Sequence, residues 1–138
     1  MKWTFDESGA PEFIRITVSG RYIKNDFSAM IAELAALESF EVGCRILVDN
    51  TSLDVKHMSD HDLLGASNAF ILNNKVFAYS KVAIVTSPSG FDFGRKFERI
   101  TEYGSRAIMK IFSDESSALG WLVGSLALAQ SAIVVTMP

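Results

Sequence analysis

The chain has 138 residues, of which 49% are hydrophobic and 21% charged, and its formal net charge is −3. This length and apolar content suit one globular domain and exclude a disordered chain. The slightly acidic balance gives no general attraction to nucleic acid, and no apolar run reaches the roughly 18 residues of a membrane span. Cys44 is the one cysteine, which excludes an internal disulfide. The N-terminus has no signal-peptide pattern, so we expect a cytoplasmic protein.

The N-terminal third of the chain predicts two strands, a helix and a third strand. Alternating apolar and polar residues over 3–5 and 13–18 favour a β-hairpin, with its turn at residues 9–11. Residues 27–37 then place apolar side chains at spacings of three and four, which indicates an amphipathic helix capped by Asn25 or Asp26. A short apolar run over residues 45–49 predicts a strand buried on both faces.

The rest of the chain continues the alternation of helix and strand. Ser59, with an acid three residues later, predicts a capping box and a helix that ends at residues 73–74. A strand over residues 81–86 is followed by a loop and by a helix that Ser89 caps and Gly104 ends. The last strand covers residues 107–112, and Ser113-Asp114-Glu115 supplies a cap and two acids at the start of a final helix.

The order β-β-α-β-α-β-α-β-α predicts an α/β fold with a mostly parallel sheet and an N-terminal hairpin. We expect five residues of its core to be buried: Leu34, Val48, Ile84, Phe97 and Ile111. The predicted domain covers residues 1–124, and residues 125–138 are an apolar tail without a charged side chain. Such a tail must be covered, either by its own domain or by a second copy of the chain. We favour the second copy and therefore expect a homodimer.

Three segments carry a resemblance to a known family. They are Gly20-Arg21-Tyr22 with Asp26-Phe27, the strand 81–85 with the helix 93–98, and residues 110–122, which contain Ser113-Asp114-Glu115 and Gly120-Trp121. On these residues, over roughly positions 3–124, the sequence resembles the SpoIIAA-like, or STAS/SEC14-type, family of small bacterial proteins. The resemblance implies the SpoIIAA-like fold. Its motifs are mostly structural, and most members of that group have no assigned chemistry.

The resemblance also draws attention to Ser59. The anti-sigma-factor antagonists related to this family are switched by phosphorylation of a serine at the start of the helix after the third strand, and Ser59 stands near that place. Their Asp-Ser-Ser-Gly stretch is absent here, and Asp60 and Asp62 would repel an added phosphate. We therefore favour a capping role for Ser59 over a phosphorylation switch.

Several residues are candidates for a ligand or partner surface. Asp49 is predicted at the carboxyl end of a parallel strand, where open α/β sheets bind ligands. Arg95 and Arg99 lie one helical turn apart in a basic cluster, and Phe91 lies in a first turn beside a loop. The full candidate set is Asp49, Ser59, Ser87, Phe91, Arg95 and Arg99.

Each candidate also has a structural interpretation. Asp49 can hold the turn that follows it, and the two arginines, interleaved with Glu98, are typical of a solvated helix face. A receiver-type phosphoacceptor at Asp49, with Thr86 and Lys110 as partners, lacks the paired acids after the first parallel strand.

Histidines and aromatic residues gather elsewhere in the sequence. His57 and His61 are four residues apart, but His57 precedes the expected helix cap, so a solvated loop is favoured over a metal site. A dense aromatic set suits core packing or the edge of an apolar pocket. Its members are Phe70, Phe77, Tyr79, Phe91, Phe93, Phe97 and Tyr103.

The sequence contains no catalytic triad, phosphate-binding glycine loop or dinucleotide fingerprint, and we expect no cofactor. The first functional hypothesis is a non-enzymatic interaction or regulatory module. The alternative, from the aromatic set and the SEC14-type resemblance, is a binder of a small apolar or lipid-like ligand. An unrecognised enzyme is a third hypothesis. An apolar cavity would favour the ligand binder over the interaction module.

Overall fold

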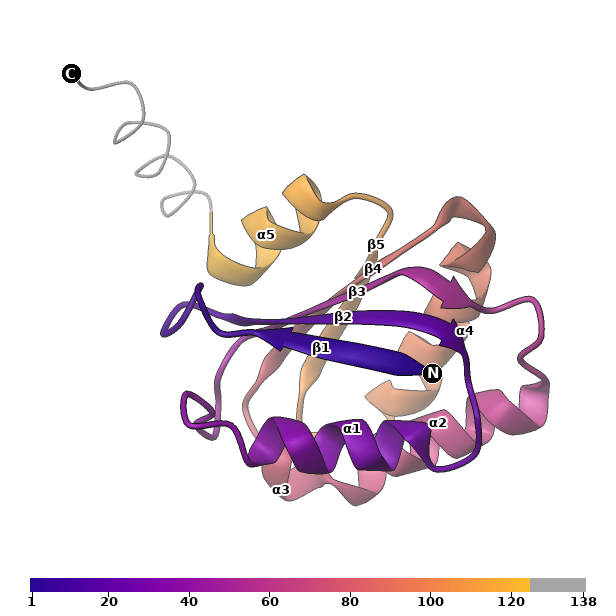
Figure 1. Ribbon diagram of the computed structural model, residues 1–138, viewed down its shortest axis with the longest axis horizontal. Coiled ribbons are helices and arrows are strands. Elements are labelled where there is room, and N and C mark those ends of the chain that lie inside the picture. Colours follow the sequence, from indigo (N-terminus) through magenta and orange to yellow (C-terminus); the bar gives the residue numbers. More distant parts are fainter. Residues whose placement is uncertain (125–138) are drawn as a thin grey trace.

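A five-stranded mixed sheet forms the centre of the computed structural model, which describes residues 1–124 (Figure 1). Its strands lie in the order in which they occur in the chain. They are β1 (Lys2–Asp6), β2 (Ile14–Arg21), β3 (Ile46–Asp54), β4 (Lys81–Thr86) and β5 (Ile108–Phe112). β1 and β2 form an antiparallel hairpin, and every later pairing is parallel. The predicted α/β class and the N-terminal hairpin are thus confirmed.

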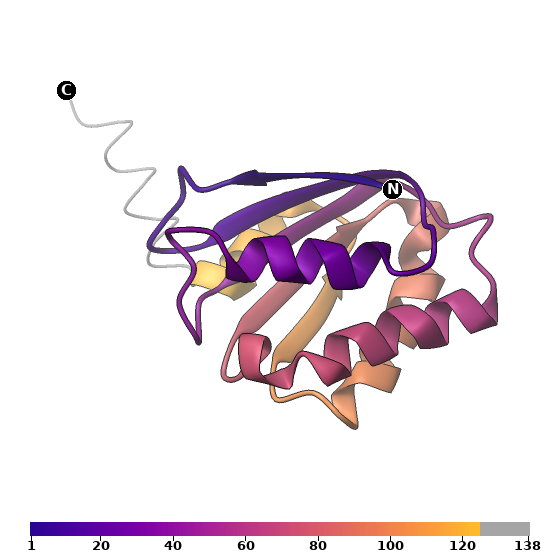
Figure 2. The ribbon, with the colours of Figure 1, turned by 60° about the horizontal axis from the view of Figure 1, so that its bottom comes forward.

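The helices cover the two faces of the sheet unequally. One face is covered by α1 (Asp26–Ala35), α2 (Asp60–Leu72) and α4 (Phe91–Glu102), and the other by α5 (Glu115–Val123) (Figures 1 and 2). When successive parallel strands are added in one direction, crossovers of a single hand place all connecting helices on the same side. The fold therefore places three helices over one apolar face.

Two apolar cores result from this arrangement. The larger lies under α1, α2 and α4, and the smaller joins Leu47, Ala83 and Val85 to α5. Four of the five predicted core residues, Leu34, Val48, Ile84 and Ile111, are buried. The fifth, Phe97, which is also predicted to be buried, is only half-buried.

The predicted helix starts agree with the structure at α2 and α5. Ser59 and Asp62 form the predicted capping box: the Asp62 N–H donates to Ser59 Oγ at 3.1 Å, and the Ser59 N–H donates to the Asp62 carboxylate at 3.0 Å. At α5, the carboxylate of Asp114 accepts from the Ser117 N–H at 2.7 Å.

Two other caps differ from the prediction. Asn25 precedes α1 in a left-handed conformation with φ 75° and makes no side-chain cap bond. The neighbouring Asp26 carboxylate accepts instead from the Ile23 N–H at 2.8 Å. Before α4, a short 3-10 turn, η1 (Pro88–Gly90), places Gly90 at the cap, so Ser89 does not cap the helix.

Other elements also extend or add to the prediction. β2 and β3 continue beyond the predicted ends at residues 18 and 49. The register of their pairing shifts between Thr17 and Ser19, and the two strands remain paired after this shift. A short helix, α3 (Asn74–Phe77), follows α2 and was not predicted. It is too short to show a helical period in the sequence.

Candidate functional site

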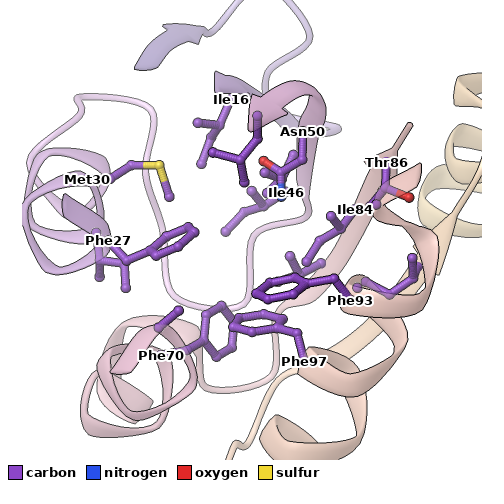
Figure 3. A pocket seen from close by; sticks show the side chains of 18 of the residues that line it. Ile16, Phe27, Met30, Ile46, Asn50, Phe70, Ile84, Thr86, Phe93 and Phe97 are labelled. Atoms are coloured by element: carbon purple, nitrogen blue, oxygen red, sulfur yellow. The ribbon is translucent and has the colours of Figure 1, made fainter. Parts of the chain in front are cut away.

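An apolar cavity of about 60 Å³ lies between the sheet and the three helices α1, α2 and α4 (Figure 3). Its floor is formed by side chains of β2, β3, β4 and β5, and its roof by side chains of the helices. The lining residues are Ile16, Phe27, Met30, Ile31, Leu34, Ile46, Val48, Asn50, Leu53, Val55, Ala66, Phe70, Phe77, Val82, Ile84, Thr86, Gly90, Phe93, Gly94, Phe97 and Ile111.

Aromatic rings from three helices surround the cavity. The ring of Phe97 on α4 lies with its centroid 6.5 Å from that of Phe27 on α1 and 6.1 Å from that of Phe70 on α2. Phe70 also stacks on Phe77 at 4.1 Å. In Figure 3, Phe93 and Phe97 face the cavity from α4, and Phe27 faces it from α1. Rings held by neighbouring rings form a largely preformed wall.

Two polar side chains interrupt the apolar lining. Asn50 and Thr86 are register partners at the carboxyl ends of β3 and β4, so their side chains project on the same face of the sheet. This is the edge at which parallel sheets place ligands. Thr86 is 5% exposed, and neither Asn50 Oδ1 nor Thr86 Oγ1 has a hydrogen-bond partner among residues 1–124.

Two glycines on the α4 side allow the backbone to approach this polar end. A Cβ at Gly94 would lie 3.1 Å from Ile111 Cγ2 and 3.2 Å from Thr86 Cγ2, which is closer than side chains normally pack. A Cβ at Gly90 would meet Ser87 Oγ at 3.3 Å. The start of α4 can therefore close the cavity above β4 and β5 only because both residues lack a side chain.

No ionisable side chain is among the described residues that line the cavity. One titratable group beside the aromatic wall is Tyr22, whose ring centroid lies 5.2 Å from that of Phe27. Burial raises the pKa of the Tyr22 phenol, and the carboxylates of Asp62 and Asp26 raise it further. The surroundings of the cavity therefore favour a neutral occupant.

The six predicted surface residues lie outside the cavity lining. Asp49 Oδ1 accepts from the Thr51 N–H at 3.0 Å and from the Thr51 hydroxyl at 2.6 Å, as expected for a carboxylate that holds its own chain segment. Ser59 is the exposed cap of α2. Ser87, half-buried after β4, lies with its Oγ 3.2 Å from that of Ser89.

The other three predicted residues belong to α4. Phe91 is half-buried against the larger core, while Arg95 and Arg99 are exposed. Arg95 Nη1 lies 4.0 Å from Glu98 Oε2, the interleaved pairing expected of a solvated helix face. The role of these six residues as a ligand or partner surface stays a prediction.

The alternative chemistries considered from the sequence find no support in the geometry. Asp49 is the register partner of Val85, which faces α5, whereas Thr86 faces the cavity. Asp49 and Thr86 therefore lie on opposite faces of the sheet and cannot act together as in a receiver domain. His57 Nδ1 lies 2.6 Å from Asp54 Oδ2, and the described residues contain no metal-ligand cluster. Burial raises the pKa of the Cys44 thiol, which opposes formation of a reactive thiolate.

The sequence prediction found part of the cavity and missed its polar end. Of the aromatic set, Phe70, Phe77, Phe93 and Phe97 line the cavity, whereas Tyr79 and Tyr103 are exposed. Asn50 was not singled out. The sequence feature that places Asn50 in the cavity is strand alternation, because residues two apart on a strand lie on the same face. Asn50 follows Val48 by two residues, as Thr86 follows Ile84.

Comparison with known proteins identifies the fold. The structure is similar to the crystal structure of an uncharacterised protein of the DUF3478 family, with a SpoIIAA-like fold, from Shewanella loihica PV-4. The TM-score is 0.58, the sequence identity is 22%, and the match covers 88% of this chain and 92% of that one. The chain has the SpoIIAA-like fold. This agrees with the resemblance seen in its sequence. No protein-family model and no curated protein matches the sequence.

A SpoIIAA-like fold does not by itself assign an activity, because one fold supports many functions. Within residues 1–124, none of the helices is both long and apolar enough to cross a membrane. The cavity is therefore the feature of the described residues from which a function can be argued.

Proposed function

We propose that the protein binds a small apolar ligand in the cavity under α1, α2 and α4. The observation that carries this proposal is the cavity itself, with its apolar lining and its wall of aromatic rings. Ligand sites in proteins are typically concave, mostly apolar and provided with a few polar groups. This proposal ranks the ligand binder above the interaction module, which was the first hypothesis from the sequence.

The energetic argument supports an occupant. Protein interiors contain few voids larger than a water molecule, for which about 10–15 Å³ suffices. A residual cavity destabilises a protein by about 24 cal/mol per Å³, so an empty volume of about 60 Å³ costs on the order of 1.4 kcal/mol. A ligand that fills the space recovers this energy and adds the transfer of its own apolar surface from water.

Native mass spectrometry of protein purified from its own host tests the proposal directly, because it shows whether a small molecule is retained. The matched control is Ala66→Leu. Ala66 is buried on α2 and lines the cavity, and leucine is also a good helix former. We expect a retained ligand in the wild type and none in this variant. A ligand retained equally by both would place the binding elsewhere, and no ligand in either would argue against the proposal.

A second candidate, an interaction module that self-associates, is favoured by a different observation. Four apolar side chains that are at least half exposed flank the amino-terminal ends of β4 and β5: Leu72, Tyr79, Tyr103 and Ile108. Hydrogen bonds hold these segments together, since the Ile108 N–H donates to the Ser80 carbonyl and the Asn74 side chain donates to the Gly104 carbonyl. Exposed apolar groups gathered in this way mark many contact surfaces.

We propose a second copy of the chain as the partner for this surface, since a symmetric dimer needs only one self-complementary patch. The test is the mass in solution of the wild type and of Tyr103→Ser, whose side chain is 93% exposed. A dimer that weakens in the variant supports the second candidate. A wild type that is monomeric at high concentration rejects it, and this result would leave the ligand proposal unaffected.

A further inference from the structure

The two unpartnered polar atoms of the cavity point to the chemistry of the ligand. Among residues 1–124, three buried side-chain oxygen atoms have no hydrogen-bond partner: Asn50 Oδ1, Ser80 Oγ and Thr86 Oγ1. Buried polar atoms in proteins are nearly always bonded, so each exception requires an explanation. Two of the three line the same cavity, as neighbours on adjacent strands, whereas Ser80 lies outside the lining (Figure 3).

The other buried hydroxyl groups show what the unpartnered ones lack. Thr101, which is 1% exposed on α4, donates to the Phe97 carbonyl at 2.9 Å. Ser67, which is fully buried on α2, donates to the Leu63 carbonyl at 2.9 Å. Thr86 ends a strand and has no carbonyl one helical turn earlier to receive its hydroxyl proton. Its hydroxyl group therefore has no hydrogen-bond partner among the described residues.

The surroundings restrict the polar group that these two residues can bind. A carboxylate or an ammonium would enter a cavity whose described lining has no ionisable side chain to balance it, and buried unpaired charges are strongly disfavoured. The carbonyl oxygen of Asn50 requires a donor, while the hydroxyl of Thr86 can donate or accept. A neutral hydroxyl group, which both donates and accepts, satisfies either residue.

We propose that the ligand is a small apolar molecule with one neutral hydroxyl group, a small apolar alcohol, and that Asn50 and Thr86 bind this hydroxyl at the polar end of the cavity. The apolar part of the molecule then lies among the aromatic rings of α1, α2 and α4. This inference rests on the proposed function, because it assigns a ligand class to the same cavity.

The test compares two probes that are small enough for the cavity, propane and ethanol, which differ by a methyl group in place of a hydroxyl. Dissociation constants for both are measured by NMR titration of the methyl groups that line the cavity. The variants are Asn50→Leu and the isosteric Thr86→Val, and the control is Thr101→Val, which removes a buried hydroxyl outside the cavity lining. The quantity of interest is the ratio of the ethanol constant to the propane constant.

We expect both probes to bind the wild type and the ratio to rise roughly fivefold in Asn50→Leu and Thr86→Val, the equivalent of one net hydrogen bond. The ratio should not change in Thr101→Val. A rise in only one of the two variants would assign the hydroxyl to that residue. If both probes bind but the ratio is the same in all four proteins, the inference is wrong and the proposed function stands. If neither probe binds, both are wrong.

Discussion

Adding one methylene group to the cavity floor should stabilise the protein, and Val48→Ile makes this change. Val48 lines the cavity from β3, between Ile16 and Ile84 on the neighbouring strands. Burying one further methylene contributes about 0.8 kcal/mol when there is space for it. Valine and isoleucine are both favoured in strands, so strand propensity does not offset this gain. We therefore expect the free energy of unfolding to rise by roughly 0.8 kcal/mol.

The control is the same substitution on the opposite face of the sheet. Val85 is 4% exposed and packs in the smaller core with α5, outside the lining of the cavity. An extra methylene in a filled core forces side chains out of their rotamers and costs about 1–3 kcal/mol. Val85→Ile should therefore destabilise the protein, and the two variants should differ in the sign of the effect.

Urea denaturation of the wild type and both variants measures these differences. With a slope of 1–3 kcal/mol/M, the expected gain for Val48→Ile corresponds to a rise of roughly 0.3–0.8 M in the unfolding midpoint. If Val48→Ile lowers the midpoint as Val85→Ile does, the space beneath the helices is already filled by side chains. That result would refute the cavity and the ligand proposal built on it.

Three further predictions concern other parts of the chain. Thr86→Val should raise the free energy of unfolding because it removes an unpartnered hydroxyl, whereas Thr101→Val should lower it by about 1 kcal/mol; urea denaturation measures both. Ser59→Ala should cost about 1 kcal/mol and Ser59→Asp little, while phosphate on Ser59 in protein from cells would instead establish a switch. Removal of residues 126–138, which lie outside the described residues, should convert a dimer into a folded monomer by light scattering; an unchanged mass would contradict this.

The elements of this fold could be predicted from local sequence patterns. The strand over residues 81–86 and the capping box at Ser59 depend on residues close together in the chain, and both agree with the structure. The sequence predicts helix caps less well, because a serine or asparagine before a helix can adopt conformations in which its side chain does not cap the helix. At Asn25 the chain enters in a left-handed conformation, and before α4 a 3-10 turn replaces the expected cap at Ser89.

The cavity could be predicted only in part. The apolar runs of the strands already placed Val48 and Ile84 in the core, and the aromatic set contained four of the residues that line the cavity. The candidate surface residues were chosen from chemistry that is visible in the sequence, such as acids at strand ends and arginines on a helix. Asn50 was overlooked because an asparagine near a strand end is usually a turn residue.

By itself, the sequence determined the α/β class, the order of strands and helices, and the resemblance to SpoIIAA-like proteins, because each depends on periodicity and turn residues within a short stretch of chain. Tertiary structure alone decided that Phe27, Phe70 and Phe97, from three separate helices, surround one space. It also decided that Asn50 and Thr86, on adjacent strands, line this space with side-chain oxygen atoms that have no partner among residues 1–124. A cavity is the volume left when distant segments pack. Its size and lining therefore depend on helix positions that no local pattern specifies.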